Sequence, residues 1–281
     1  MKKVALIIPP QSFNFNEVKL SEIKKKIKIK ISASFKKIYK KQFYWNYIFL
    51  KKNFNKYKFN IAILMGIILS AKKTNYKLYA GISVGEYLAL YYLDLDNTID
   101  LVLKRSKILY DENLIVKGIM ISITGLNIYK FKKIIKEKIK EPIYISVIYS
   151  DTFFCISLKK KTFKELKKIL KKKNVNFSVL KNNGPWHSKV IIKARPKIEK
   201  LINSYRFFFN KNFLLLSNYT GSFHKNENEL KRNLINQTFN VARWDKNLII
   251  LKNKCNFFCS PFQIKTISKI MYLTNCNIKE I

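Results

Sequence analysis

Residues 81 to 85 read Gly-Ile-Ser-Val-Gly, and this segment constrains the fold more than any other. The chain has only 7 glycines in 281 residues, and two of them flank Ser83 here. Apolar segments at 77–80 and 84–93 border the pattern, which predicts a strand, a sharp turn and a helix. Glycines suit both sides of such a turn because a side chain there would collide with neighbouring elements. We therefore expect an α/β fold in which the serine oxygen is exposed at a helix N-terminus.

The segments around this turn predict the remainder of a large domain. Pro9 and Pro10 end a first apolar strand and open a loop. The other elements are expected from their apolar periodicity, namely the first strand at 3–8, a strand at 213–218, a short strand near Phe257, and helices at 58–71, 197–205 and 227–239.

Between these parts the periodicity predicts a separate unit of about 65 residues with the order βαββαβ, which is ferredoxin-like. Its strands are expected at 119–124, 143–149, 153–158 and 176–180, and its helices at 128–140 and 162–173. The expected fold class is α/β, with an α/β-hydrolase-like large domain built on a parallel sheet and an inserted ferredoxin-like small domain. We expect the large domain to comprise 1–117 and 185–281, and the small domain 118–184.

The formal net charge of +39 would suit a nucleic acid or a membrane surface. Only five of the 56 basic residues are arginine, however, whereas proteins that read bases favour the arginine fork and cluster it on one element. The lysines are dispersed along the chain and are expected to form a solvated surface. No nucleic-acid partner is therefore expected.

No membrane segment is expected either. The apolar run near the start ends at Pro9 and is too short for a signal peptide, and the stretch 61–71 is too short to span a bilayer. The four cysteines show neither a Cys-x-x-Cys pair nor metal-ligand spacing. We expect a cytoplasmic protein with reduced thiols, no metal and no cofactor.

A serine nucleophile needs a base, and the chain offers two histidines. His224 lies in a segment that predicts a charged turn, Gly-Ser-Phe-His-Lys-Asn-Glu-Asn. His187 follows Trp186 where the inserted unit rejoins the large domain, and such a junction forms a cleft that can enclose a ligand. This position favours His187, although an isolated histidine is more often structural than catalytic.

Ordered segments along nearly the whole chain match one family. They are Ile-Pro-Pro-Gln at 8–11, the turn and its helix at 81–93, Leu-Val-Leu-Lys-Arg at 101–105, 118–125, Pro-Trp-His-Ser at 185–188, 214–221, and Gln-Thr-Phe-Asn-Val-Ala-Arg-Trp at 237–244. In these segments the chain resembles the malonyl-CoA:acyl-carrier-protein transacylases and the acyltransferase domains of fatty-acid and polyketide synthases.

The resemblance implies roles for residues of this chain. Ser83 would attack a thioester carbonyl, while His187 would accept its proton and return it to the departing thiol. In the family a main-chain carbonyl orients the imidazole, and it maps to Gln237. The backbone amides of Val84 and Gln11 would form the oxyanion hole.

The resemblance also implies a substrate. Arg105 would pair with the free carboxylate of a malonyl group, which a guanidinium binds bidentately. Trp186 would crowd an α-substituent and favour malonyl over methylmalonyl. The expected reaction moves malonyl from malonyl-CoA to the phosphopantetheine thiol of an acyl carrier protein through a malonyl-serine ester, with a monomeric enzyme of fatty-acid or polyketide synthesis.

Several positions depart from the family pattern and leave alternatives open. Ile82 stands where the family has histidine, and Pro10 and Ser12 replace glycines beside Gln11. An acyl hydrolase that clears carrier proteins in a polyketide pathway is therefore a second hypothesis. A basic RNA-binding or carrier-docking module without activity is a third, and it leaves Ser83, His187 and Arg105 without a role.

Overall fold

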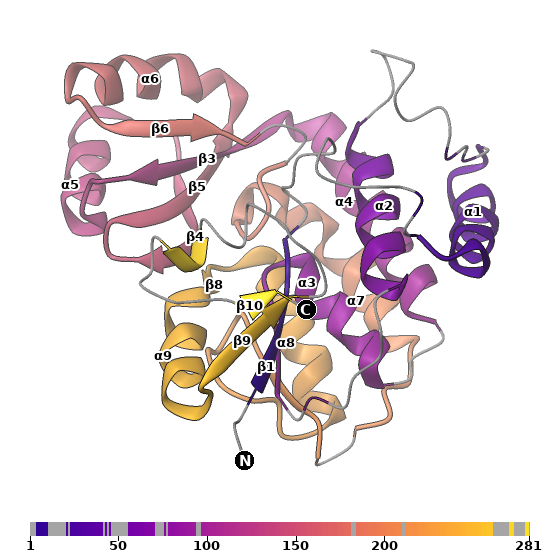
Figure 1. The fold of residues 1–281 in the computed structure, drawn as a ribbon. Coiled ribbons are helices and arrows are strands. Elements are labelled where there is room, and N and C mark those ends of the chain that lie inside the picture. Colours follow the sequence, from indigo (N-terminus) through magenta and orange to yellow (C-terminus); the bar gives the residue numbers. More distant parts are fainter. Residues whose placement is uncertain are drawn as a thin grey trace.

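A computed structural model gives the fold of the chain (Figure 1). The structure describes residues 4–10, 21, 23–41, 43, 45, 56–70, 76, 78–93, 97–180, 184–209, 212–260, 270–272 and 279–280. Within these residues the chain forms two sheets, with helices around the first and on one face of the second. None of the described helices is both long and apolar enough to cross a membrane.

The first sheet is parallel throughout, with the strand order β10-β9-β1-β2-β7. Its strands are β1 (Val4–Ile8), β2 (Leu78–Gly81), β7 (Leu214–Leu216), β9 (Phe257–Ser260) and β10 (Lys279–Glu280). The described side chains of its central strands are almost entirely buried, as expected for a parallel sheet with both faces covered. The carboxyl ends of β1 and β2 therefore meet at one edge, and Ser83 follows β2 there.

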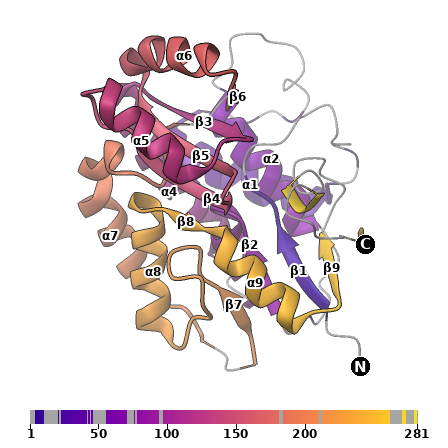
Figure 2. The ribbon, with the colours of Figure 1, turned by 90° about the vertical axis from the view of Figure 1, so that its left-hand side faces the viewer.

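Helices surround this sheet and support its edge (Figures 1 and 2). They are α1 (Lys25–Tyr39), α2 (Lys56–Ser70), α3 (Val84–Ala89), η4 (Leu90–Leu93), α4 (Thr98–Val116), η6 (Lys189–Ala194), α7 (Arg195–Asn203), α8 (Glu227–Phe239) and α9 (Trp244–Lys254). The short helix α3 contacts β1, β2 and β7, while α4 packs against α1, α2 and α7. The turn that carries Ser83 is thus held between the sheet and a layer of helices.

The second sheet has the order β6-β3-β5-β4-β8. It comprises β3 (Gly118–Thr124), β4 (Tyr144–Ser150), β5 (Phe153–Lys159), β6 (Asn176–Val179) and β8 (Ala242–Arg243), and its connections include α5 (Ile128–Lys138), η5 (Lys160–Thr162) and α6 (Phe163–Lys172). The first four strands are antiparallel and have the βαββαβ order of a ferredoxin-like unit. β8 comes from the C-terminal part and pairs in parallel with β4, so it joins that part to the inserted unit.

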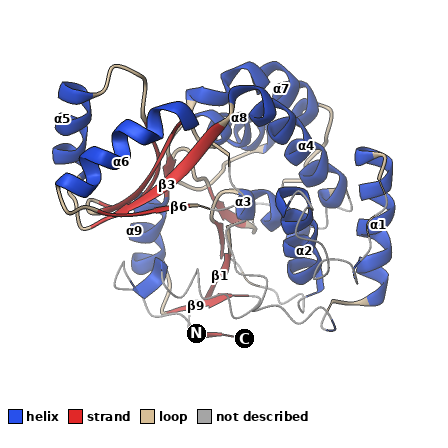
Figure 3. Cartoon of the chain, turned by 90° about the horizontal axis from the view of Figure 1, so that it is seen from above, coloured by secondary structure: helices blue, strands red, loops and turns tan. Residues whose placement is uncertain are grey.

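The two faces of β5 bury different neighbours, as the period of two in a strand requires. Phe154 and Ile156 pack in one apolar cluster with residues of α5 and α6, which cover that face of the sheet (Figure 3). Cys155 belongs instead to the main core, and the hydroxyl of Ser157 donates to the main-chain oxygen of Trp186 at 2.8 Å. The second face therefore packs against the segment that leads to His187.

The predicted fold class is confirmed, and the expected elements agree with the structure to within a few residues. Among the described residues, no element was predicted at the helices α1, α4, η6 and α9 or at the strands β8 and β10.

Candidate active site

The turn between β2 and α3 holds Ser83 in a strained conformation. Its backbone has φ 59° and ψ −115°, outside the regions that a non-glycine residue ordinarily occupies. A Cβ atom on Gly85 would lie 2.5 Å from the main-chain oxygen of Ile8, and one on Gly81 would collide with the main chain of Gly85. The glycines are therefore required by close approach of backbone to backbone, which confirms the physical reason for the predicted turn.

His187 lies directly beside this serine. The distance from Ser83 Oγ to His187 Nε2 is 2.7 Å, and that from His187 Nδ1 to the main-chain oxygen of Gln237 is 2.5 Å. Because a carbonyl oxygen only accepts, Nδ1 carries the proton and Nε2 is free to accept one from the serine hydroxyl. The main-chain N–H of His187 also donates to the carbonyl of Thr238, at 2.9 Å, which fixes the backbone at this point.

Burial lowers the pKa of His187 from its usual 6.5 to about 4. Loss of solvent is the largest cause, the hydrogen bond to the Gln237 carbonyl opposes it, and the positive charge of Arg105 lowers the pKa further. The imidazole is consequently neutral at pH 7, which is the state that can act as a base.

Arg105 projects from α4 toward the same place and is only 3% exposed. Its Nη2 donates to Thr238 Oγ1 at 3.3 Å, and its guanidinium lies 4.3 Å from the centre of the Tyr87 ring. Among the described residues no carboxylate pairs with this charge, and Nε has no hydrogen-bond partner there. A buried cation with spare donors is chemically suited to bind an anion.

The remaining predicted residues have different positions. Gln11 lies outside the residues that the structure describes. Val84 is the first residue of α3, directly after the nucleophile. Trp186 is buried and its indole packs over Gly184.

Sequence reasoning missed three buried polar residues of this site. Asn218 accepts a hydrogen bond from the main-chain N–H of Ser83 at 2.8 Å, and Glu86 accepts one from the main-chain N–H of Asn218 at 2.9 Å. His224 lies in the irregular connection between β7 and α8, where a turn was predicted, but its side chain is 3% exposed and contacts Glu86 at 3.0 Å. A signal for Glu86 existed, because it is the only charged residue in the apolar run 84–93.

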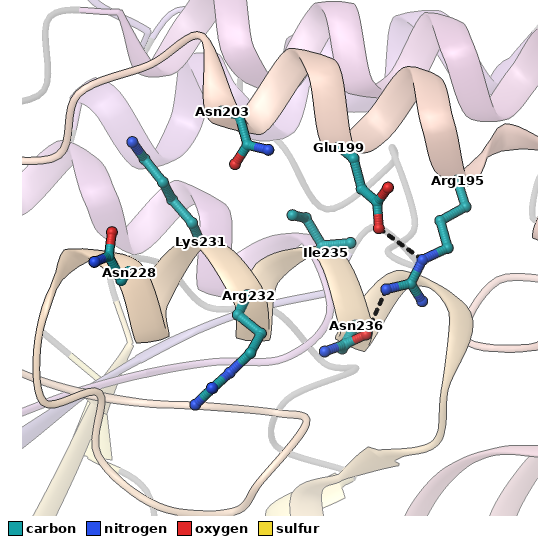
Figure 4. A pocket seen from close by; sticks show the side chains of 8 residues that line it. All are labelled: Arg195, Glu199, Asn203, Asn228, Lys231, Arg232, Ile235 and Asn236. Atoms are coloured by element: carbon teal, nitrogen blue, oxygen red, sulfur yellow. Dashed lines mark hydrogen bonds and ion pairs between the residues drawn. The ribbon is translucent and has the colours of Figure 1, made fainter.

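A separate hollow of about 230 Å³ lies between α7 and α8 (Figure 4). It is lined by Arg195, Glu199, Asn203, Asn228, Lys231, Arg232, Ile235 and Asn236. Arg195 is already engaged there, with Glu199 at 2.7 Å and Asn236 at 3.1 Å. None of the predicted site residues lines this hollow.

The fold and the geometry around Ser83 define a class, that of α/β enzymes in which a serine on a strand-to-helix turn is paired with a histidine. Comparison with known proteins shows similarity to one kind of acyltransferase. The chain is 25% identical over 273 residues to the malonyl CoA-acyl carrier protein transacylase of Buchnera aphidicola subsp. Schizaphis graminum, covering 90% of this chain and 86% of that protein. A second transacylase of this name, from Buchnera aphidicola subsp. Baizongia pistaciae, is 24% identical over 79% of this chain and 73% of its own length.

Solved structures agree on the fold. The malonyl CoA-acyl carrier protein transacylase of Coxiella burnetii superposes with a TM-score of 0.83 at 15% identity, over 99% of this chain and 93% of that one. A malonyl-transacylase solved in complex with its type II polyketide acyl carrier protein superposes with a TM-score of 0.81 at 17% identity, over 100% of this chain and 96% of that one. No family model matches the chain. The resemblance predicted from the motifs is confirmed: the chain is similar in sequence and in fold to the malonyl-CoA:acyl-carrier-protein transacylases.

Proposed function

We propose that the chain transfers a malonyl group from malonyl-CoA to the phosphopantetheine thiol of an acyl carrier protein, with Ser83 as the nucleophile. The observation that carries this proposal is the 2.7 Å contact between Ser83 Oγ and Nε2 of a neutral, buried His187. The similarity to proteins named malonyl CoA-acyl carrier protein transacylase supports the substrate pair. The same similarity favours transfer over the hydrolase hypothesis and over a module without activity.

In the first half-reaction Ser83 Oγ attacks the thioester carbonyl of malonyl-CoA while His187 Nε2 accepts the hydroxyl proton. Collapse of the tetrahedral intermediate breaks the C–S bond, and the imidazolium returns the proton to the departing coenzyme A thiol. The thiol of the carrier protein then attacks the malonyl-serine ester by the reverse sequence, which regenerates the Ser83 hydroxyl. In each half-reaction His187 accepts one proton and then returns it, so the imidazole is neutral again at the end.

The negative oxygen of each intermediate needs donors that are already in place. We propose the main-chain N–H groups of Val84 and Gln11 for this role. Support for Val84 comes from its position at the start of α3, where the helix dipole favours negative charge. The main-chain N–H of Ser83 cannot serve, because Asn218 Oδ1 already accepts its hydrogen bond.

We propose that Arg105 binds the malonyl carboxylate. Its guanidinium is buried, close enough to His187 to lower the pKa of that residue, and held by Thr238 and Tyr87. A neutral acyl group would leave a buried cation unpaired, and this is the physical basis of selectivity for malonyl. Trp186, buried beside His187, is proposed to exclude an α-substituent.

The proposal extends to organisation and place of action. We propose that 118–184 moves as a small domain against a large domain of 1–117 and 185–281, supported by the separate apolar cluster beneath α5 and α6. We also propose that the enzyme is a cytoplasmic monomer. Cys155 is a buried free thiol, as expected in a reducing compartment.

Intact-mass measurement tests the function directly. Mixing the enzyme with malonyl-CoA is expected to add one malonyl group to the wild type and none to Ser83→Ala. Addition of a holo carrier protein should then remove the group from the enzyme and add it to the carrier. An adduct that persists in Ser83→Ala, or one released to water faster than to the carrier, would contradict the proposal.

A further inference from the structure

A network of buried polar side chains lies directly beneath the Ser83 turn and has no role in the mechanism above. Its members are Glu86, Asn218, His224 and Gln237, each between 0% and 3% exposed. Burial of so many polar groups is costly unless they are paired, and each of the four side chains has at least one hydrogen-bond partner at this site, although Gln237 Oε1 has none among the described residues.

The carboxylate of Glu86 is the centre of this network. Its Oε2 accepts hydrogen bonds from the main-chain N–H of Asn218, at 2.9 Å, and from the side-chain amide of Gln237, at 3.0 Å. Its Oε1 lies 3.0 Å from His224 Nε2. Two residues of the β7–α8 connection and one residue of α8 thus converge on one buried carboxyl group.

Each of the first two donors is also bonded to the reacting pair. Asn218 spans the turn, since its Oδ1 accepts from the Ser83 N–H at 2.8 Å and its Nδ2 donates to the carbonyl of Gly81 at 2.6 Å. Gln237 supplies the main-chain oxygen that holds His187 Nδ1. One carboxylate therefore fixes both the turn that presents the nucleophile and the residue that orients the base.

His224 fixes the carboxylate in turn. Its Nδ1 lies 3.3 Å from the amide nitrogen of Asn233, and its main-chain N–H donates to Leu215 of β7 at 3.1 Å. If Asn233 donates to Nδ1, then the proton of a neutral imidazole is on Nε2 and points at Glu86, so one tautomer satisfies both contacts.

From these contacts we infer that Glu86 and His224 are positioning residues for the proposed acyl transfer: they hold Ser83 and the Gln237 carbonyl in the register that the 2.7 Å Ser83–His187 contact requires. Neither side chain touches the reacting atoms. The inference depends on the proposed function only for the identity of the acyl group, because the reactivity of Ser83 is measurable without it.

Three variants test the inference in the full-length chain, namely Glu86→Ala, Glu86→Gln and His224→Ala. The glutamine variant preserves the shape of the network without its charge. In this variant the amide oxygen takes the place of Oε2, and the NH₂ group donates to His224 Nε2. The imidazole proton of His224 then lies on Nδ1. It is donated to Asn233 Oδ1 once the Asn233 amide has rotated. Asn233 Oδ1 has no hydrogen-bond partner among the described residues, so this rotation breaks no contact of that atom.

Leu170→Ala is the matched control. Leu170 is buried in the apolar cluster of α5, α6 and the second sheet, away from the network, so its truncation lowers the Tm without touching the site. The Tm of every variant reports folding. The rate at which a fluorophosphonate probe labels Ser83 reports nucleophile activation, and kcat and KM for malonyl-CoA report the proposed reaction.

We expect the probe to label Glu86→Ala and His224→Ala about 10- to 100-fold more slowly than the wild type. Loss of a group that hydrogen-bonds to a metal-binding histidine has an effect of this size. Their kcat should fall with KM unchanged, and Glu86→Gln should recover most of the rate. Leu170→Ala should be labelled at the wild-type rate despite its lower Tm.

Three outcomes would overturn the inference. They are labelling of folded His224→Ala at the wild-type rate, an equal loss of labelling rate in Leu170→Ala, and labelling of Glu86→Gln as slow as that of Glu86→Ala. If the wild type is labelled but accepts no malonyl, the proposed function fails, and the labelling rates still decide the inference.

Discussion

The Nδ1 atom of His187 lies 2.5 Å from the main-chain oxygen of Gln237, so a peptide carbonyl takes the position that an aspartate has in a Ser-His-Asp triad. A carbonyl fixes the tautomer of the imidazole as a carboxylate would, but it brings no negative charge. The imidazolium that forms during attack is therefore stabilised less, and the hydrogen bond to the Gln237 carbonyl only partly opposes the burial that lowers the pKa of His187. The pair favours a neutral base at rest.

Removal of this base should slow acylation far more than any substitution in the network beneath it. We expect His187→Ala to lower the single-turnover rate of Ser83 acylation by malonyl-CoA by about 10²–10⁴-fold, the usual contribution of a positioned base. The other histidine, in His224→Ala, should have a smaller effect because it acts only through Glu86. The reverse ranking in rapid-quench measurements would show that His187 is not the base.

The low pKa of His187 predicts that acylation persists in mildly acidic solution. With a pKa of about 4 the imidazole stays neutral at pH 5, whereas a histidine at 6.5 would be almost fully protonated there. We expect kcat/KM for malonyl-CoA to change little from pH 7 to pH 5 and to fall toward pH 4. An acid limb centred near pH 6.5 would contradict the burial of this side chain.

The same shift makes stability depend on pH. Between pH 6.5 and about 4 the unfolded chain binds a proton at His187 that the folded chain does not bind. The free energy of unfolding therefore decreases as the pH falls through this window, and its contribution from His187 is constant above 6.5. Chemical unfolding at pH 7 and pH 5 should show a smaller decrease for His187→Ala than for the wild type, and equal decreases would refute the linkage.

Backbone contact at the turn predicts the effect of the mildest substitution there. A Cβ on Gly85 would lie 2.5 Å from the carbonyl oxygen of Ile8 and 2.8 Å from that of Pro9. We expect Gly85→Ala to reduce the free energy of unfolding by about 3 kcal/mol and to abolish acylation, because the turn must move. Gly125→Ala is the control: its φ of 81° costs about 1–2 kcal/mol, but its Cβ meets nothing within 4 Å. Similar urea midpoints for the two variants would exclude the contact as the cause.

The sequence predicts those parts of the fold whose periodicity is unambiguous. The strands and helices between 118 and 180 alternate clearly, and all of them are present. Helix α1 was missed because Lys-Ile-Lys-Ile alternates with the period of a strand, although Ile27, Ile31, Phe35 and Tyr39 recur every four residues and are buried. Helix α4 carries Arg105, but its charges interrupt the apolar pattern.

In the candidate site, too, features set by neighbouring residues are predictable, whereas contacts between residues distant in the sequence are not. The turn around Ser83 is predictable, because two glycines within five residues are a local signal in the sequence, although the atoms that require Gly85 belong to the distant Ile8 and Pro9. The network beneath it is not, since Asn218 and Gln237 lie 132 and 151 residues from Glu86, and only the folded sheet brings them together. His224 was mistaken for a surface residue because its neighbours in sequence are charged, whereas its own side chain turns inward.

Arg105 provides the sharpest test of substrate choice. This residue is 3% exposed and its Nε has no partner among the described residues, so a bound malonyl carboxylate would supply an acceptor and an acetyl group would not. A hydrogen bond to a charged group is worth about 1.5–3 kcal/mol, which predicts a preference for malonyl-CoA of roughly 10- to 150-fold in single-turnover acylation. Arg105→Ala should lose this preference by slowing malonyl transfer while sparing acetyl transfer. Arg243→Ala is the control, because that arginine is paired with Asp245 at 2.7 Å and should leave the preference unchanged. A wild type that prefers acetyl-CoA, or an Arg105→Ala variant that slows both substrates equally, would remove Arg105 from the acyl site.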